Sequence, residues 1–289
     1  MAEAGARGPG PFPPPPEGRV LHLPARGRCL VSTDLHGDLD AFHALRDRFV
    51  ALRRDHPESH WVQLGDWVHG PDDDTRAQEP ALYGYPDRSW DVLEALWDAQ
   101  SRWPGYVHAV LGNHDMAHLG GRKTRKFHPD EAAFLEASLS PAQRDTLRAR
   151  LGVMLLAVVT PCGPLLTHGA PDRRVLSLAQ LDRMPLPPAT ADDQRALDSV
   201  LWSYGQAPDE MSALLARLSA EGTPLTLVLH GHDKDEGGWF AEGHNQGCPV
   251  IFGAPRAARR CVVLDLAGWY PDVHALRAGV EIVPVHPAV

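Results

Sequence analysis

Short apolar segments alternate along the chain with longer stretches in which apolar residues recur at helical spacing. The apolar segments predict β-strands over residues 29–33, 61–64, 107–111, 154–160, 165–167, 225–229, 250–252 and 261–266. The helical spacing predicts helices over residues 39–54, 90–101, 141–151 and 209–221, with Ser89 and Ser140 as N-caps and Gly222 just beyond the last helix. Alternating strands and helices are typical of a layered α/β fold.

The organisation outside this rhythm is simple. Residues 1–18 are rich in Gly, Pro and Ala, and we interpret them as a disordered, solvated tail, with a docking segment for a proline-binding partner as the alternative. Residues 19–289 contain no linker, so we expect a single domain there. The acidic stretch 70–88 and the basic stretch 118–130 are expected to be long loops.

Charge and composition exclude several classes of function. The net charge of −9 argues against binding to nucleic acid or to an anionic membrane. The longest apolar runs, such as residues 153–159, are far shorter than the ~20 residues of a membrane-spanning helix. The N-terminus has no apolar stretch typical of a signal peptide, and four scattered cysteines do not form a disulfide framework. We therefore expect a cytoplasmic protein.

Side chains that bind metal ions follow five of the predicted strands directly. They are Asp34 and His36, Asp66, Asn113 and His114, His168, and His230 and His232. Since sites in α/β folds form at the carboxyl ends of strands, we expect these groups to converge. A set of carboxylate, imidazole and amide donors suits manganese, iron or zinc better than calcium. Asp66, central in the set, suits a carboxylate that bridges two cations.

The motifs at these positions match a known family. DLHGD (34–38), GDWVHG (65–70), GNHD (112–115), HGAP (168–171) and HGH (230–232) resemble, in this order, the calcineurin-like metallophosphoesterases. LWS (201–203), HDKDEGGW (232–239) and IFGAP (251–255) resemble segments of one branch, the Ser/Thr protein phosphatases and their bacterial relatives. The resemblance covers roughly residues 28–266. It implies a four-layer αββα sandwich, in which two mixed sheets lie between helices.

The resemblance also implies a role for each residue. Asp34, His36 and Asp66 would bind a first metal ion, and Asp66, Asn113, His168 and His232 a second. His114 would be the catalytic histidine. His230 stands where the branch has an arginine, so we expect it to lie behind the ligands rather than to bind metal, although both histidines of the HGH motif are ligands in other branches.

The reaction implied by the resemblance is hydrolysis of a phosphomonoester. A hydroxide that bridges two divalent ions attacks phosphorus in line, and His114 protonates the leaving oxygen. We expect Mn²⁺, with iron or zinc as alternatives. The expected substrate is a protein phosphorylated on Ser or Thr, or on these and Tyr. The alternative is a small phosphorylated metabolite or nucleotide, as for dinucleoside polyphosphate hydrolases or phosphodiesterases, and the minor alternative is a catalytically weak binding scaffold.

The chain departs from the branch at the groups that hold substrate. His69 stands where an aspartate normally pairs with the catalytic histidine, and is expected beside the metal ligands or among them. Gly70 stands where an arginine normally binds phosphate. The candidate replacements are Arg122, Lys123, Arg125 and Lys126, and less favourably Arg173 and Arg174; a solvated basic loop is the alternative for the first group. Asp72, Asp73 and Asp74 are interpreted as turn residues rather than as partners of His114. Trp67 is a further candidate for the edge of the site.

Overall fold

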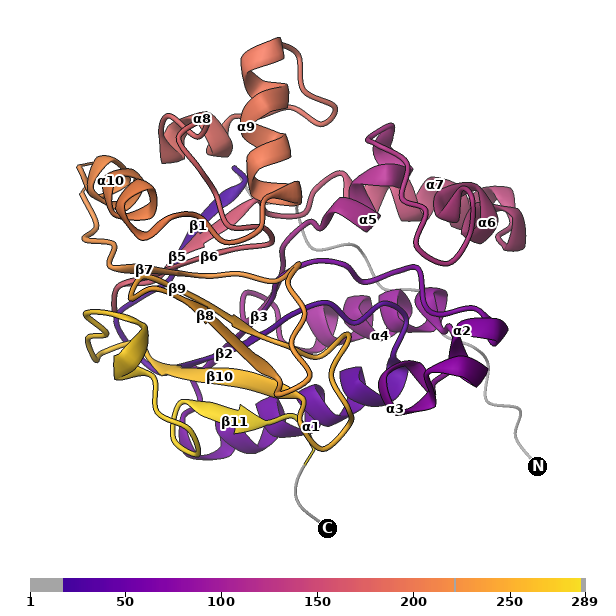
Figure 1. Cartoon of the computed structure of the whole chain (residues 1–289), viewed down its shortest axis with the longest axis horizontal. Coiled ribbons are helices and arrows are strands. Elements are labelled where there is room, and N and C mark those ends of the chain that lie inside the picture. The colour runs from indigo at the N-terminus through magenta and orange to yellow at the C-terminus, as the bar shows by residue number, and fades with distance from the viewer. Residues whose placement is uncertain (1–17, 221, 287–289) are drawn as a thin grey trace.

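The structure is a computed structural model that describes residues 18–220 and 222–286, and its strands form two sheets (Figure 1). One sheet has the order β11 (Ile282–Pro284), β10 (Arg260–Asp265), β2 (Arg28–Ser32), β3 (His60–Gln63), β4 (Val107–Ala109). Strands β2, β3 and β4 are parallel, and β10 runs antiparallel to both of its neighbours. The parallel strands therefore direct three chain segments to the same edge.

The second sheet has the order β1 (Val20–His22), β5 (Ala157–Val159), β6 (Pro164–Thr167), β7 (Leu227–Leu229), β9 (Gln246–Pro249), β8 (Trp239–Glu242). Strands β6, β7 and β9 are parallel, whereas β5 and β8 run antiparallel to their partners β6 and β9. Both sheets are thus mixed, as the resemblance implied.

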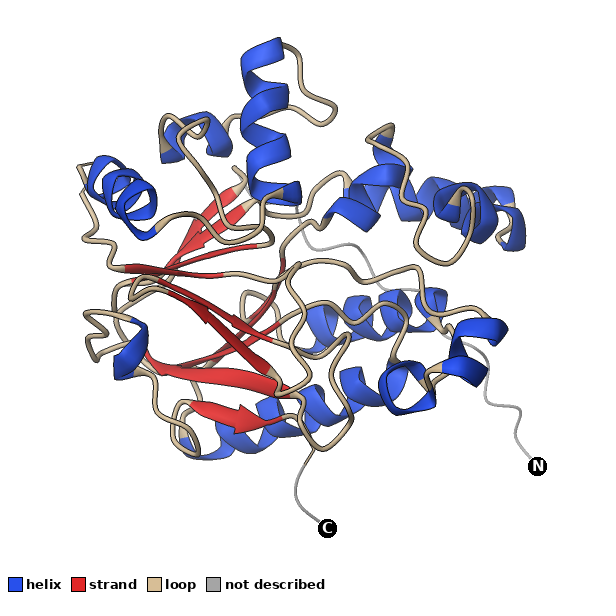
Figure 2. Ribbon diagram, in the orientation of Figure 1, coloured by secondary structure: helices blue, strands red, loops and turns tan. Residues whose placement is uncertain are grey.

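The two sheets face each other between layers of helices (Figure 2). Side chains on successive strand residues point to opposite faces. Cys29 and Val31 of β2 accordingly join an inner core with Leu166 and Leu229 of the other sheet, while Leu30 belongs to a separate cluster with helix residues. Helices α1 (Leu39–Asp55) and α4 (Ser89–Arg102) cover the first sheet, and α8 (Leu178–Asp182), α9 (Ala191–Trp202) and α10 (Pro208–Ser219) cover the second. The predicted αββα sandwich is confirmed.

The two predicted N-cap residues have different outcomes. Helix α7 (Pro141–Leu151) begins at the predicted Ser140, whose hydroxyl accepts from the Gln143 N–H in a capping box. The N-cap prediction for Ser89 is wrong, because Ser89 is the first residue inside α4. Its hydroxyl oxygen instead accepts from the backbone N–H of His69 at 2.9 Å. The start of α4 thereby fixes the turn that carries His69.

Other differences from the prediction lie in short or exposed elements. Residues 250–252 do not form a strand, because the strand β9 ends before them. The expected loop 70–88 contains α2 (Asp73–Gln78) and α3 (Pro80–Tyr83), and α2 buries no residue, so it leaves no apolar periodicity to detect. The three aspartates expected in a turn instead start this helix, with Asp72 as its N-cap and Asp73 and Asp74 as its first residues. The predicted tail lies outside the described residues, except Gly18.

The segment after β4 carries short helical elements around the basic stretch. Helix α5 (Asn113–Met116) and the 3₁₀ helix η1 (Ala117–Leu119) precede it, and α6 (Glu131–Ser138) follows it. A second 3₁₀ helix, η2 (Val273–Ala275), lies near the C-terminus. In the ranges that the structure describes, no helix combines the length and the apolar character needed to cross a membrane.

Candidate metal centre

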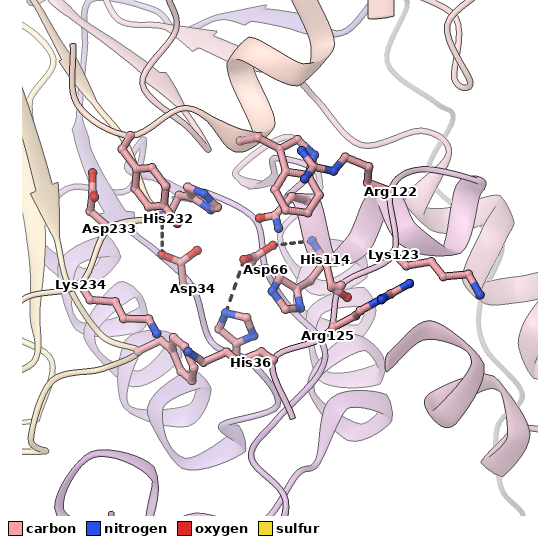
Figure 3. A pocket seen from close by; sticks show the side chains of 16 residues that line it. Asp34, His36, Asp66, His114, Arg122, Lys123, Arg125, His232, Asp233 and Lys234 are labelled. Atoms are coloured by element: carbon pink, nitrogen blue, oxygen red, sulfur yellow. Dashed lines mark hydrogen bonds and ion pairs between the residues drawn. The ribbon is translucent and has the colours of Figure 1, made fainter. Parts of the chain in front are cut away.

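Five strand ends bring the predicted ligands together, and Figure 3 shows Asp34, His36, Asp66 and His232 around one pocket. Asp34 and His36 follow β2, Asp66 follows β3, Asn113 follows β4, His168 follows β6 and His232 follows β7. Asp66 is the member shared by two metal-compatible groups, one with His36 and His114 and the other with His168 and His232. All six side chains are buried or half-buried. The convergence that the sequence predicts is therefore present in the fold.

Two of the histidines are oriented by backbone carbonyl oxygens. His36 Nδ1 lies 3.0 Å from the Val68 oxygen, and His168 Nδ1 lies 2.7 Å from the Leu64 oxygen. When one ring nitrogen of a neutral histidine carries the proton and donates it to a carbonyl oxygen, the other nitrogen has a lone pair that can bind a metal ion. That nitrogen, Nε2, lies 3.4 Å from Asp66 Oδ2 in His36 and 3.6 Å from Asp66 Oδ1 in His168.

The donor set fits a cation. His168 Nε2 presents its lone pair to the Asn113 amide oxygen at 2.9 Å, and two lone pairs at this distance are stabilised by a positive ion between them. Asp34 Oδ1 is buried and has no hydrogen-bond partner in the described part of the chain. Burial, and then the charge of Asp66, raises the pKa of Asp34 well above its usual range. A divalent cation would offset each of these costs.

The ligands are held by strained backbone. In the described part of the chain, four non-glycine residues have positive φ angles, namely His36 (44°), Asp66 (53°), His69 (69°) and His232 (69°). Such angles are unfavourable for residues with a Cβ atom and concentrate at functional sites. Three of the four are predicted ligands, and His69 lies in the same turn as Asp66.

Asp115 joins two of the ligand-bearing turns. This carboxylate is completely buried and accepts from the backbone N–H groups of Gly112, Asp66 and Trp67 at 2.8, 2.9 and 3.1 Å. Gly112 is required here, because a Cβ atom would collide with the backbone nitrogen and Oδ1 of Asp66. Asp115 therefore sets the separation of Asp66 and Asn113.

The remaining candidates take different places. His230 is completely buried, its Nδ1 lies 2.8 Å from the Gly231 oxygen, and it belongs to none of the metal-compatible groups found among the described residues. Trp67 is also completely buried and donates to the Val110 oxygen, so it does not border the site. Asp72 accepts from the Thr75 N–H at 2.7 Å within its own helix.

His114 stands beside the ligands and is bonded on its far side. Its backbone N–H donates to Asp66 Oδ1 at 3.0 Å. Its Nδ1 lies 3.0 Å from Nδ1 of His69 and 3.3 Å from Oε2 of Glu131. Burial lowers the pKa of His114 well below its usual value, and the charge of Asp66 opposes this effect. A phosphoryl dianion beside the ring would favour its protonated form.

A pocket of about 290 Å³ opens over these groups. Five of the six predicted ligands line it, together with His114, the basic segment 122–126 and the rings of Trp202, Tyr204 and Phe252. Arg122 and Arg125 are thus brought to the site, whereas Arg173 is not among the lining residues. The side chains of Lys123 and Arg125 extend away from Asp34 and Asp66 in Figure 3, and Lys123 is paired with Asp130.

Lys126 and Lys234 form a pair of ammonium groups on the opposite wall. Their Nζ atoms lie 5.0 and 5.1 Å from the centre of the Phe252 ring, and that ring lies 3.9 Å from the ring of His36. Partial burial of the ammonium group, and then the hydrogen bond with Lys234 and its charge, lowers the pKa of Lys126 to about 7, although much of the residue's surface is exposed. Lys234 was missed by sequence reasoning; its place two residues after His232 is the signal that could have found it.

Comparisons with known proteins agree with this geometry. A family model described as calcineurin-like phosphoesterase matches residues 27–265. A protein serine/threonine phosphatase from Saccharomyces cerevisiae, with similarity to human phosphatase PP5, has 16% sequence identity and a TM-score of 0.58, over 85% of this chain and 76% of that one. A cold-active protein-tyrosine phosphatase from a psychrophilic Shewanella species has 16% identity and a TM-score of 0.53, over 86% and 78%. Comparison with curated proteins finds no match. The chain belongs to the calcineurin-like phosphoesterase family and is a metal-dependent phosphoesterase.

Proposed function

We propose that this enzyme hydrolyses phosphomonoesters with two divalent metal ions, and that its substrates are proteins phosphorylated on Ser or Thr. One observation carries the proposal: five strand ends place the shared carboxylate Asp66 between two groups of donors, with His114 beside it. The basic and exposed segment 122–126 at the rim of the pocket suits the negative charge of a phosphopeptide.

In this proposal Asp34, His36 and Asp66 hold one ion, and Asp66, Asn113, His168 and His232 hold the other. Bound divalent ions supply positive charge that activates water and neutralises the phosphoryl oxygens. His114 Nδ1 is engaged by His69 and Glu131, so Nε2 is the nitrogen left to donate a proton to the leaving oxygen as the P–O bond breaks.

The phosphate is held, in this proposal, by a clamp that differs from the one the motifs of the branch imply. Lys126 and Lys234 offer two ammonium groups beside the ligand His36, and no carboxylate of the described residues forms a salt bridge with either. Arg122 lies 4.5 Å from the centre of the Trp202 ring, which positions it on the other wall. We therefore assign phosphate binding to Lys126, Lys234 and Arg122 rather than to Arg125.

A pH-dependent difference between Lys126→Arg and the wild type tests this clamp. Lys126 loses its charge as the pH rises through and above about 7, whereas arginine stays charged. Binding that depends on this charge is present at lower pH and is lost as the pH rises. We expect the ratio of kcat/KM, variant over wild type, for p-nitrophenyl phosphate to rise about threefold to tenfold between pH 7 and 9. A ratio that does not change with pH would show that Lys126 stays charged in this range, and an unchanged kcat/KM in Lys126→Ala would contradict the assignment.

One observation favours a second candidate function. Trp202, Tyr204 and Phe252 line the pocket, and aromatic rings stack on nucleobases as readily as on side chains of a peptide. The alternative substrate is therefore a small phosphorylated metabolite or a nucleotide, such as a dinucleoside polyphosphate.

Substrate comparison separates these candidates. The protein, loaded in turn with Mn²⁺, Zn²⁺ and Fe²⁺, would be assayed on phosphopeptides, dinucleoside polyphosphates, p-nitrophenyl phosphate and bis(p-nitrophenyl) phosphate. We expect the highest kcat/KM on phosphopeptides. Preference for dinucleoside polyphosphates would support the alternative, and preference for the diester would replace the phosphomonoesterase proposal with a phosphodiesterase. Failure to hydrolyse any ester with any ion would contradict the proposed function.

A further inference from the structure

The carboxyl group of Glu131 is buried directly behind His114. Glu131 is 1% exposed and begins helix α6. Its Oε1 accepts from the Phe127 N–H at 2.9 Å, but its Oε2 has no hydrogen-bond partner among the residues that the structure describes. A buried carboxylate oxygen left in this way is costly unless a charged or donor group faces it. The groups that face it are His114 Nδ1 at 3.3 Å and His69 Nδ1 at 3.9 Å.

A chain of hydrogen bonds leads from His114 toward the surface. His69 Nε2 lies 3.0 Å from His118 Nε2, and His118 Nδ1 lies 2.9 Å from Glu136 Oε1. Glu136 also pairs with Arg148 at 2.5 Å, which keeps it an acceptor. His118 then donates from Nδ1, and its Nε2 is free to accept. Each remaining contact between nitrogens needs one proton.

Burial favours the neutral form of His69 and His118. When both of these rings are neutral, the contacts determine which nitrogen carries each proton. His69 donates from Nε2 to His118, so its Nδ1 carries no proton and presents a lone pair. The proton between His69 Nδ1 and His114 Nδ1 must therefore belong to His114. That Nδ1–H faces two acceptors, the lone pair of His69 and the unpaired Oε2 of Glu131.

We propose that Glu131, acting with His69, is the positioning residue of His114: it holds the ring by Nδ1–H and keeps Nε2 directed into the pocket. This inference rests on the proposed role of His114 as proton donor. In the motif that the chain resembles, His69 stands at the position of an aspartate that pairs with the catalytic histidine. In the structure, the carboxylate that contacts the His114 ring belongs to Glu131, which lies 62 positions after His69 in the sequence.

The substitution Glu131→Gln tests the proposal through the leaving group. The amide is nearly isosteric but lacks the charge that orients Nδ1–H. We expect kcat to fall about 10-fold to 100-fold on an alkyl phosphate such as a phosphoserine peptide. The effect should be much smaller on p-nitrophenyl phosphate, whose leaving group needs little protonation. In a His114→Gln background the same substitution should have no further effect. Glu94→Gln, on the exposed face of α4, serves as the control for the substitution itself.

A measurement that does not depend on catalysis distinguishes a failure of this inference from a failure of the proposed function. In protein labelled with ¹⁵N-histidine and free of metal, we expect NMR to show His114 as the Nδ1–H tautomer, and Glu131→Gln to shift it toward Nε2–H. That result would support the inference even if no phosphate ester were hydrolysed. An Nε2–H tautomer in the wild type, or equal losses on both leaving groups, would overturn it. A third metal ion per chain that is lost in Glu131→Gln would also overturn it, because His69, His114 and Glu131 would then be ligands.

Discussion

Asp66→Asn is expected to abolish metal-dependent hydrolysis and to prevent the binding of a complete pair of ions. Asp66 is the member of the site that groups with the donors on both sides. Asparagine keeps an oxygen that can accept from the His114 N–H, but it loses the charge and the second anionic oxygen that two cations can share. We expect kcat/KM for p-nitrophenyl phosphate to fall at least about 10³-fold. Elemental analysis should find fewer bound ions than in the wild type.

The stability of the protein provides the control for this variant. Burial, and then the charge of Asp66, raises the pKa of Asp115 to about 8, so the carboxylates of the metal-free site repel one another. Asp66→Asn relieves that repulsion, but it also removes the charge that His168 and His114 stabilise, which lowers the pKa of Asp66 well below its usual range in spite of burial. Because these effects oppose each other, we expect the melting temperature without metal to stay close to that of the wild type. Added Mn²⁺ should raise Tm in the wild type and much less in the variant, since only the folded wild type binds tightly. Unchanged metal content in Asp66→Asn would contradict a bridging role.

Elements with buried, periodic side chains could be predicted from the sequence, and the others could not. The helix predicted over 39–54 is α1, because its apolar residues face a sheet and recur at helical spacing. Helix α2 buries no side chain, and β11 buries only one of its three residues, so neither leaves a pattern. The prediction of a strand over 250–252 was wrong because burial alone does not distinguish a strand from a buried turn. These residues are buried, but they follow the end of β9.

The residues of the site divide in the same way. The predicted ligands come from motifs at strand ends, and the order of parallel strands suffices to bring them together. Glu131 contacts His114 from another segment and no local motif marks it, whereas Lys234 is marked only by its place two residues after His232. Arg173 shows the converse, since its position after HGAP suggested a phosphate contact although the pocket is lined by other residues. Contacts between residues that are far apart in the sequence could be identified only from the structure.

His114→Ala is expected to lower kcat strongly while leaving the metal content unchanged. The ring is engaged at Nδ1 by His69 and Glu131, so its proposed contribution is a proton delivered from Nε2. Loss of such a donor costs about 10² to 10⁴ in rate. The loss should be largest for phosphoserine peptides and smaller for p-nitrophenyl phosphate, because an alkoxide leaves with more difficulty than a nitrophenolate.

Metal content decides between this role and a competing one. His114 has a ring nitrogen within 4.8 Å of ligand atoms of His36 and Asp66, so the geometry also permits it to bind a cation. A ligand would lose metal on substitution by alanine, whereas a proton donor would not. The metal content of His230→Ala provides the comparison. The ring of His230 is buried and belongs to no metal-compatible group among the described residues. Metal loss in His114→Ala, together with equal rate losses on both leaving groups, would make His114 a ligand, and the proton for the leaving oxygen would then have to come from another group.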